Sequence, residues 1–443
     1  MSGPSSCLFA RPGLLLLGLL LLFPGLARAD CVTGTCHADL AGGQGLHAPV
    51  ADGDCDGCHQ SGGASHPGKE SMSLVAAGAE LCLNCHDDPR AYRFVHGPVA
   101  DGDCIACHDP HRPGDGAKAV ASLCGQCHET GMQNVPVQHG PVAVGDCLSC
   151  HRVHASPWPK LLVEEGAGLC FRCHEDFSRR MRQAKVVHAA IEGQGCTGCH
   201  TVHGGGEKHL LGKKRPELCL DCHQDVGDAV GRSRVGHAAL QRPESCGVCH
   251  QTHFSGQAGL LNGSVRDICL RCHGVDDNRR SHPLRNIATE IDGKQVLHGP
   301  VADGDCGACH RPHGSDFFRL LSGNYPSEFY SPYKKGNYDF CLQCHDGNML
   351  RFADTSLYTN FRDGKRNLHY LHVANPVKGR TCRVCHQPHA GDSPKLIRTD
   401  GVPFGEWTIP IRFRQTETGG SCMPGCHRQE SYDREKPLIP EKG

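Results

Sequence analysis

Thirty of the 31 cysteines in this 443-residue chain form fifteen pairs, and a histidine directly follows the second cysteine of every pair. Two residues separate the cysteines in thirteen of these triplets, which are Cys55, Cys58, His59; Cys82, Cys85, His86; Cys104, Cys107, His108; Cys124, Cys127, His128; Cys147, Cys150, His151; Cys170, Cys173, His174; Cys196, Cys199, His200; Cys219, Cys222, His223; Cys246, Cys249, His250; Cys269, Cys272, His273; Cys306, Cys309, His310; Cys341, Cys344, His345; and Cys382, Cys385, His386. Two wider triplets stand at the ends of the series: Cys31, Cys36, His37 and Cys422, Cys426, His427. Chance would place a histidine after about one second cysteine in fifteen, so the pattern is chemical.

The sequence Cys-x-x-Cys-His is the attachment site of c-type haem, where two thiols add to the vinyl groups and the histidine becomes an axial iron ligand. Disulfides are common in exported proteins, and sets of cysteine and histidine also bind zinc. Neither alternative requires a histidine after every second cysteine. The spacing therefore predicts fifteen covalently attached haem c groups, each with its iron.

Seventeen histidines remain for the opposite axial positions, and most of them fall into two registers. The motif at Cys31 stands alone, and the other fourteen motifs form seven successive pairs of motifs, beginning with the motifs at Cys55 and Cys82. The first register precedes the first motif of each such pair by a short segment: His47, His96, His139, His188, His237, His298 and His372. The second register lies three residues after a motif histidine: His111, His154, His203, His253, His313 and His389. His66 replaces this register after the motif at Cys55, where Gly62 occupies the usual place. We expect one of His209, His282 and His369 to complete the fifteenth site.

A histidine three residues after a motif histidine lies on the same face if the segment is helical, so it cannot reach the far side of its own haem. We therefore expect the second register to ligate a neighbouring haem, each segment binding one haem covalently and capping the next. Few methionines are available, with six in the whole chain. The sequence thus predicts haems with two histidine ligands and low reduction potentials.

The spacing of the motifs indicates a repeat array with haem as its core. Successive motifs from Cys31 to Cys269 begin 20 to 27 residues apart, and the later gaps are wider. Aromatic residues are 5% of the chain, too few to fill a large core. We expect mainly short α-helices and loops with little β-structure, in an elongated multihaem array. The expected divisions are a compact repeat region at 30–313 and a C-terminal region at 314–443 with wider-spaced haems.

Residues 1–29 have the order of a secretory signal peptide: a basic residue, an apolar stretch and Ala27-Arg28-Ala29. The apolar stretch is shorter than the roughly 20 residues that span a membrane, and Pro24 interrupts it. The mature chain is therefore expected to be exported and not to span the membrane itself. Because Lys and Arg (46) do not exceed Asp and Glu (47), nucleic acid is not an expected partner.

The doubled motifs resemble those of multihaem c-type cytochromes from dissimilatory metal-reducing bacteria. The segments Asn367-Leu-His-Tyr-Leu-His-Val and Gly419-Gly-Ser-Cys-Met-Pro-Gly-Cys-His resemble the terminal part of that group. The resemblance implies an electron conduit between the periplasm and outside acceptors, with other redox proteins, an outer-membrane porin and other multihaem cytochromes as partners. The implied location is the periplasm, the outer membrane or the extracellular surface.

Two other functions compete with a conduit that transfers electrons by haem-to-haem hopping and catalyses no reaction. A multihaem nitrite or hydroxylamine oxidoreductase has a similar haem density but needs an iron with an open position, whereas the histidines here suffice for all fifteen. A self-assembling extracellular cytochrome filament would borrow a terminal ligand from the next subunit. Filaments visible by electron microscopy would identify that case.

Overall fold

The computed structural model describes residues 37–40, 45–68, 70–113, 120–128, 135–278 and 283–439. The expected signal peptide, Cys31, Cys36 and His282 lie outside these residues. The chain divides into two compact units, one formed by Met1–Thr130 and Val144–Glu164, the other by Gly131–Ala143 and Glu165–Gly443.

The first unit consists of short helices and two small antiparallel sheets. Its α-helices are α1 (Ala48–Ala51), α2 (Ala79–Leu83), α3 (Gly97–Ala100) and α4 (Val120–Cys124). Its 3-10 helices are η1 (Ala38–Leu40), η2 (Cys55–Gly57), η3 (Pro89–Ala91), η4 (Cys104–Ala106) and η7 (Pro159–Leu161). Strand β1 (His59–Ser61) pairs with β2 (Met72–Leu74), and β3 (Phe94–Val95) pairs with β5 (Ala155–Ser156).

The second unit contains the longer helices, which reach nine residues. Its α-helices are α5 (Gly140–Ala143), α6 (Gly166–Phe171), α7 (Glu175–Gln183), α8 (Ala189–Gln194), α9 (Glu217–Leu220), α10 (Gln224–Arg232), α11 (Val265–His273), α12 (Ala288–Ile291), α13 (Gly299–Ala302), α14 (Asp339–Leu342), α15 (Leu368–Val373) and α16 (Cys382–Cys385). Its 3-10 helices are η8 (Cys196–Gly198), η9 (Lys208–Leu210), η10 (Ala238–Gln241), η11 (Ser245–Val248), η12 (Ala258–Leu260), η13 (Cys306–Ala308), η14 (Phe318–Leu320), η15 (Gly347–Leu350) and η16 (Pro394–Leu396).

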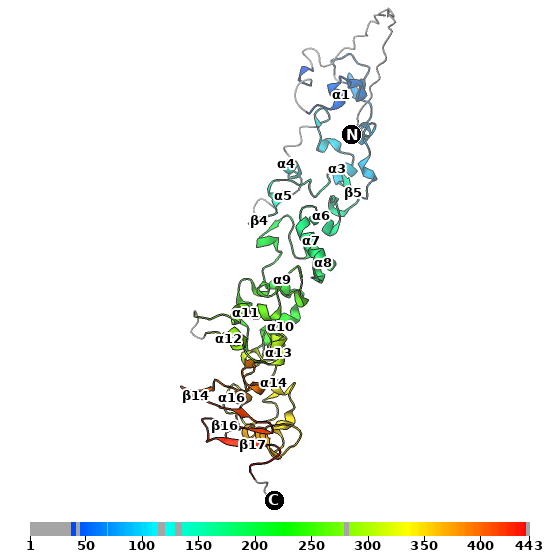
Figure 1. The fold of residues 1–443 in the computed structure, drawn as a ribbon. Helices are drawn as coiled ribbons and strands as arrows, with labels where there is room; N and C mark the ends of the chain where they lie inside the picture. Colours follow the sequence, from blue (N-terminus) through cyan, green and yellow to red (C-terminus); the bar gives the residue numbers. More distant parts are fainter. Residues whose placement is uncertain are drawn as a thin grey trace, which may run out of the picture. The chain divides into compact units, whose positions relative to one another are not determined.

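The strands of the second unit are two to four residues long and antiparallel. The pairs are β4 (Val137–Gln138) with β7 (Gly204–Gly205), β6 (Val186–Val187) with β8 (Phe254–Ser255), β9 (Val296–Leu297) with β12 (Ala390–Gly391), β10 (Arg362–Asp363) with β11 (Arg366–Asn367), and β13 (Val402–Phe404) with β14 (Trp407–Ile409). One three-stranded sheet, β15 (Arg414–Gln415), β16 (Gly419–Cys422) and β17 (Glu430–Asp433), carries the start of the last motif. Figure 1 shows β14, β16 and β17 close together near the C-terminus. The prediction of short helices with little β-structure is confirmed for the described part of the chain.

The two motifs of a pair differ in local structure because different residues precede them. A first motif such as that at Cys104 begins a 3-10 turn after Gly102, whose φ of 75° favours glycine. A second motif such as that at Cys82 begins near the end of an α-helix, directly after an apolar residue of that helix, Leu81. In both cases the histidine amide donates to the carbonyl of the first cysteine, at 3.0 Å, so the motif closes one helical turn.

A backbone hydrogen bond joins the two histidine registers in successive repeats. The amide of a first-register histidine donates to the carbonyl of the second-register histidine from the next pair of motifs. The bonds, 2.8–3.2 Å long, are His47 to His111, His96 to His154, His139 to His203, His188 to His253, and His298 to His389. The short sheets β3–β5, β4–β7, β6–β8 and β9–β12 lie beside four of these bonds and fix the register. Each of these five repeats is thereby connected to the following one.

Apolar side chains form little core in the described residues, where ten hydrophobic side chains are buried. Two clusters exist, and both lie after residue 320. One contains Tyr325, Tyr338, Leu350 and Val373, and the other Val384, Val402 and Ile411. The described residues before 320 contain no such cluster of buried apolar side chains. This is expected if a prosthetic group fills the interior there. No described helix has both the length and the hydrophobicity needed to cross a membrane.

Candidate haem-binding sites

In the described part of the chain, twelve motif histidines lie opposite a histidine from outside the motifs, with ring centroids 5.7–6.4 Å apart. The pairs are His37 with His66, His86 with His47, His59 with His111, His128 with His96, His108 with His154, His174 with His139, His223 with His188, His200 with His253, His273 with His237, His250 with His313, His345 with His298, and His386 with His369. The rings are within 26° of parallel except for His108 and His154, at 39°.

This spacing fits an iron atom between the two rings. A metal–imidazole bond of about 2.0 Å and about 1.1 Å from the nitrogen to the ring centre place two trans imidazoles about 6.2 Å apart, centre to centre. Stacked rings in direct contact would lie closer, at about 3.5–4 Å between carbon atoms. His108 and His154 show the orientation directly, because their Nε2 atoms face each other; at 3.4 Å they are closer than the distance of about 4.0 Å that two bonds of about 2.0 Å require. The residues present therefore fit a haem with two histidine ligands.

The other ring nitrogen, Nδ1, is held by a carbonyl oxygen at many of these histidines. In five first motifs, Nδ1 of the motif histidine donates to the carbonyl of the residue nine positions later: Lys160, His209, Gly259, Arg319 and Lys395, at 2.8–3.0 Å. First-register His47 and His237 donate in the same way to Pro110 and Pro312, at 3.0 Å. A proton on Nδ1 leaves Nε2 free to bind a metal and fixes the ring orientation.

The acceptor carbonyls after the motifs belong to a recurrent strained turn. Lys160 (φ 57°), His209 (59°), Arg319 (55°) and Lys395 (58°) are left-handed without being glycine, and the leucine after each is left-handed as well. Each such residue costs about 1–2 kcal/mol in L-amino acids. A further hydrogen bond holds the turn, because the carbonyl of the left-handed leucine is also an acceptor. The Leu161 carbonyl, for example, accepts from the Arg152 amide at 2.7 Å. The sequence signal is a pair of large apolar residues, Leu-Leu or Leu-Ile, which sequence reasoning missed.

The two registers have different partners. A first-register histidine faces the second motif of the pair that it precedes, as His96 faces His128. A second-register histidine faces the first motif of the preceding pair, as His111 faces His59. The second register thus lies against a neighbouring segment, as expected. The expectation was that each segment would provide a ligand to the next haem along the chain, whereas these histidines lie at the site of an earlier motif. The backbone bond between the registers explains the direction, because it ties each second-register histidine to the repeat before it.

The three histidines outside both registers have different surroundings. His369 faces His386, with centroids 6.4 Å apart, and its Nδ1 is 2.8 Å from the Thr359 hydroxyl. His209 is exposed, and its backbone carbonyl accepts a hydrogen bond from Nδ1 of His200. His282 lies outside the described residues. Two more motif histidines interact electrostatically with a predicted ligand, His310 with His389 and His427 with His372.

The buried histidines are neutral, which is the form that binds a metal. Burial, together with the neighbouring His386, lowers the pKa of His369 to about 4. Burial likewise lowers the pKa of His310, His372 and His389. Free imidazoles therefore line these sites at neutral pH.

The thiols of consecutive motifs lie close enough to interact. In five places the first cysteine of a second motif interacts with the first cysteine of the motif that follows it. These cysteine pairs are Cys82 and Cys104, Cys124 and Cys147, Cys219 and Cys246, Cys269 and Cys306, and Cys341 and Cys382. Burial, with Cys246 nearby, raises the pKa of Cys219 to about 11. Within each unit these contacts place attachment sites side by side in sequence order.

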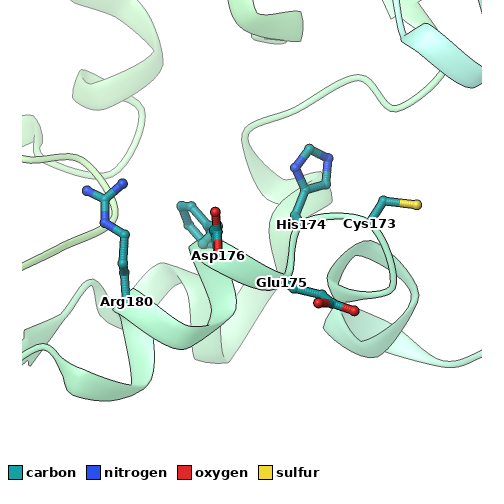
Figure 2. Close-up of a pocket in the computed structure, with 6 residues that line it drawn as sticks. Cys173, His174, Glu175, Asp176 and Arg180 are labelled. Atoms are coloured by element: carbon teal, nitrogen blue, oxygen red, sulfur yellow. The ribbon is translucent and has the colours of Figure 1, made fainter.

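A cavity of about 500 Å³ opens beside one motif histidine and is lined by Cys173, His174, Glu175, Asp176, Phe177 and Arg180. Its volume lies within the roughly 300–1,000 Å³ of cofactor pockets. Figure 2 shows Cys173 and His174, which directly precede helix α7 in the chain, and Arg180, which lies on that helix. A guanidinium at this place suits a carboxylate such as a haem propionate.

Paired imidazoles beside cysteine pairs define the site of a c-type cytochrome with several haems. A family model described as "Doubled CXXCH motif" matches residues 47–91, 96–133, 139–179, 188–228, 237–278, 298–350 and 375–403. Because these matches cover more than half of the chain, the protein belongs to this family of multihaem c-type cytochromes, which carry covalently bound haem c and transfer electrons. No curated protein matches the chain.

Proposed function

We propose that the chain binds fifteen haem c groups, each between two histidines, and conducts electrons along them. The motif histidines and cysteines hold each haem on one side. The opposite ligands are His47, His66, His96, His111, His139, His154, His188, His203, His237, His253, His298, His313, His369, His372 and His389.

The observation that carries this proposal is the set of twelve histidine pairs at 5.7–6.4 Å, in which each motif histidine has a partner of its own. Bound haem c supplies a one-electron Fe(III)/Fe(II) couple, and two imidazole ligands favour low potentials. The backbone bonds between registers hold successive sites in order, and the thiol contacts within each unit keep neighbouring sites close. These features support electron transfer from site to site within each unit.

We further propose that the protein is exported and works in extracellular electron transfer or metal respiration. The signal-like order of residues 1–29 and the resemblance of the doubled motifs support this role. The expected partners are other redox proteins, further multihaem cytochromes among them, and an outer-membrane porin.

Two measurements on the purified holoprotein test the proposal. Denaturing mass spectrometry should give the mass of the mature chain plus fifteen haems. Coulometric titration should take up about fifteen electrons per chain over a broad range of low potentials. Fewer haems would contradict the count, and a catalytic current with nitrite or hydroxylamine would favour an oxidoreductase.

A further inference from the structure

Glu290 contacts a predicted haem ligand from a distant part of the chain. Its Oε2 atom accepts a hydrogen bond from Nδ1 of His389, at 3.1 Å and across 99 positions of sequence. The two side chains are 20% and 25% exposed, so water competes only partly for the bond. Glu290 lies in α12, which packs against β12, the strand that directly follows His389.

The backbone holds this contact in place. Strand β12 pairs with β9, Ala390 opposite Leu297, and the His298 amide donates to the His389 carbonyl at 3.0 Å. On its other side Glu290 forms an ion pair with Arg285. The carboxylate is thus fixed between a cation and the imidazole.

The acceptor at His389 differs in charge from those at comparable sites. His47 and His237 donate to backbone carbonyls, and His369 has the neutral hydroxyl of Thr359 as its neighbour. At second-register His111, the Asp109 carboxylate is 3.9 Å from Nδ1, beyond hydrogen-bond distance. A bond to a carboxylate is roughly twice as strong as one between neutral groups.

A carboxylate acceptor changes the imidazole as a ligand. It draws the Nδ1 proton toward itself, which increases the electron density at Nε2 and makes the ring a stronger donor to a metal. A stronger donor stabilises ferric iron more than ferrous iron. Arg285 and Arg319 also act electrostatically on His389. Their positive charge opposes this effect, so it is best measured by changing Glu290 alone.

We propose that Glu290 is a positioning residue that strengthens His389 as an axial ligand and so lowers the reduction potential of the haem attached at Cys306 and Cys309. This inference rests on the proposed function, since it takes His310 and His389 as the two ligands of that haem. The expected size is about a tenfold change in the ferric–ferrous equilibrium of one haem, which corresponds to 59 mV for a one-electron couple.

The test compares Glu290→Gln with a matched control, Asp292→Asn, in the full holoprotein. Both variants remove one carboxylate charge, but Asp292 forms an exposed ion pair with Arg266 at 3.3 Å. Two readouts are used: a potentiometric titration followed by difference absorption spectra, and electron paramagnetic resonance of the oxidised protein. In the wild type, one low-spin haem should show the narrower spread of g values that a strongly donating imidazole produces.

Glu290→Gln should raise the reduction potential of one haem, which corresponds to about a tenfold change in its ferric–ferrous equilibrium. It should also remove the low-spin signal with the narrower spread of g values. Asp292→Asn should change neither the potential nor this signal. A Glu290→Gln titration and spectrum identical to the wild type would overturn the tuning role. If Glu290→Gln fails to bind all its haems, the wild-type spectrum decides, because absence of the distinct component also overturns it. His389→Ala separates the two proposals: a new high-spin haem confirms ligation by His389, and an unchanged spin state shows that the ligand assignment itself fails.

Discussion

Replacement of His369 by alanine should open one iron site in the chain. His369 lies in α15 with its ring centroid 6.4 Å from that of His386, and its Nδ1 is 2.8 Å from the Thr359 hydroxyl. An alanine side chain cannot reach a metal bound by His386. Covalent attachment through Cys382 and Cys385 does not depend on His369, so the haem should remain bound.

The size of the effect follows from the pairing. With fifteen haems, loss of one axial ligand converts about one fifteenth of the iron from low-spin to high-spin. The signal of a five-coordinate ferric haem lies well away from the low-spin signals in electron paramagnetic resonance, so a fraction of this size can be integrated. The haem content of the same sample, measured as the pyridine haemochrome, gives the reference for that integration.

His209→Ala is the matched control. The side chain of His209 is exposed, and the histidine serves the site through its backbone carbonyl, which alanine retains. This variant should stay low-spin throughout. A high-spin signal in His209→Ala, or none in His369→Ala with full haem content, would refute the assignment of His369 as the fifteenth ligand.

Three further changes test the structure around the sites. Gly419→Ala should weaken the β16–β17 pairing and the binding of the last haem, because an added Cβ would overlap the Tyr432 carbonyl. Gly193→Ala is the control, since an added Cβ there has open space and should be tolerated. Mass spectrometry of the two variants compares their haem counts. Hydroxyl and backbone donors lower the pKa of Asp433 to about 2, so its charge stabilises the fold above about pH 4 and this contribution disappears as the pH falls toward 2. The melting temperature of Asp433→Asn should therefore lie below the wild type at pH 7, and the difference should shrink as the pH falls toward 2 and disappear below it; an unchanged difference would contradict this. Lys395→Val should destabilise the turn by about 1–2 kcal/mol relative to Lys395→Gly, since the backbone at φ 58° suits glycine; equal melting temperatures would argue against strain there.

Local sequence signals predicted the motifs and both histidine registers, because each depends on spacing within one repeat. The partner of each register was not predictable from spacing alone. His111 faces the motif of the preceding pair because a backbone bond joins it to His47, 64 positions earlier. Such pairing is a tertiary property.

The same reason explains the residues that sequence reasoning left open or missed. His369 could not be chosen over His209 because neither belongs to a repeating register. Glu290 meets His389 across 99 positions, and no local pattern marks it. The strained turn after the first motifs is different, because its Leu-Leu or Leu-Ile pair recurs in the sequence and could have been found.

Every iron in this protein is expected to lie between two histidines. Electron paramagnetic resonance of the fully oxidised holoprotein, integrated against its haem content, tests it most directly. We expect low-spin ferric signals that sum to all fifteen haems. A high-spin signal equal to one haem per wild-type chain would contradict it and would indicate an open iron site suited to an enzyme.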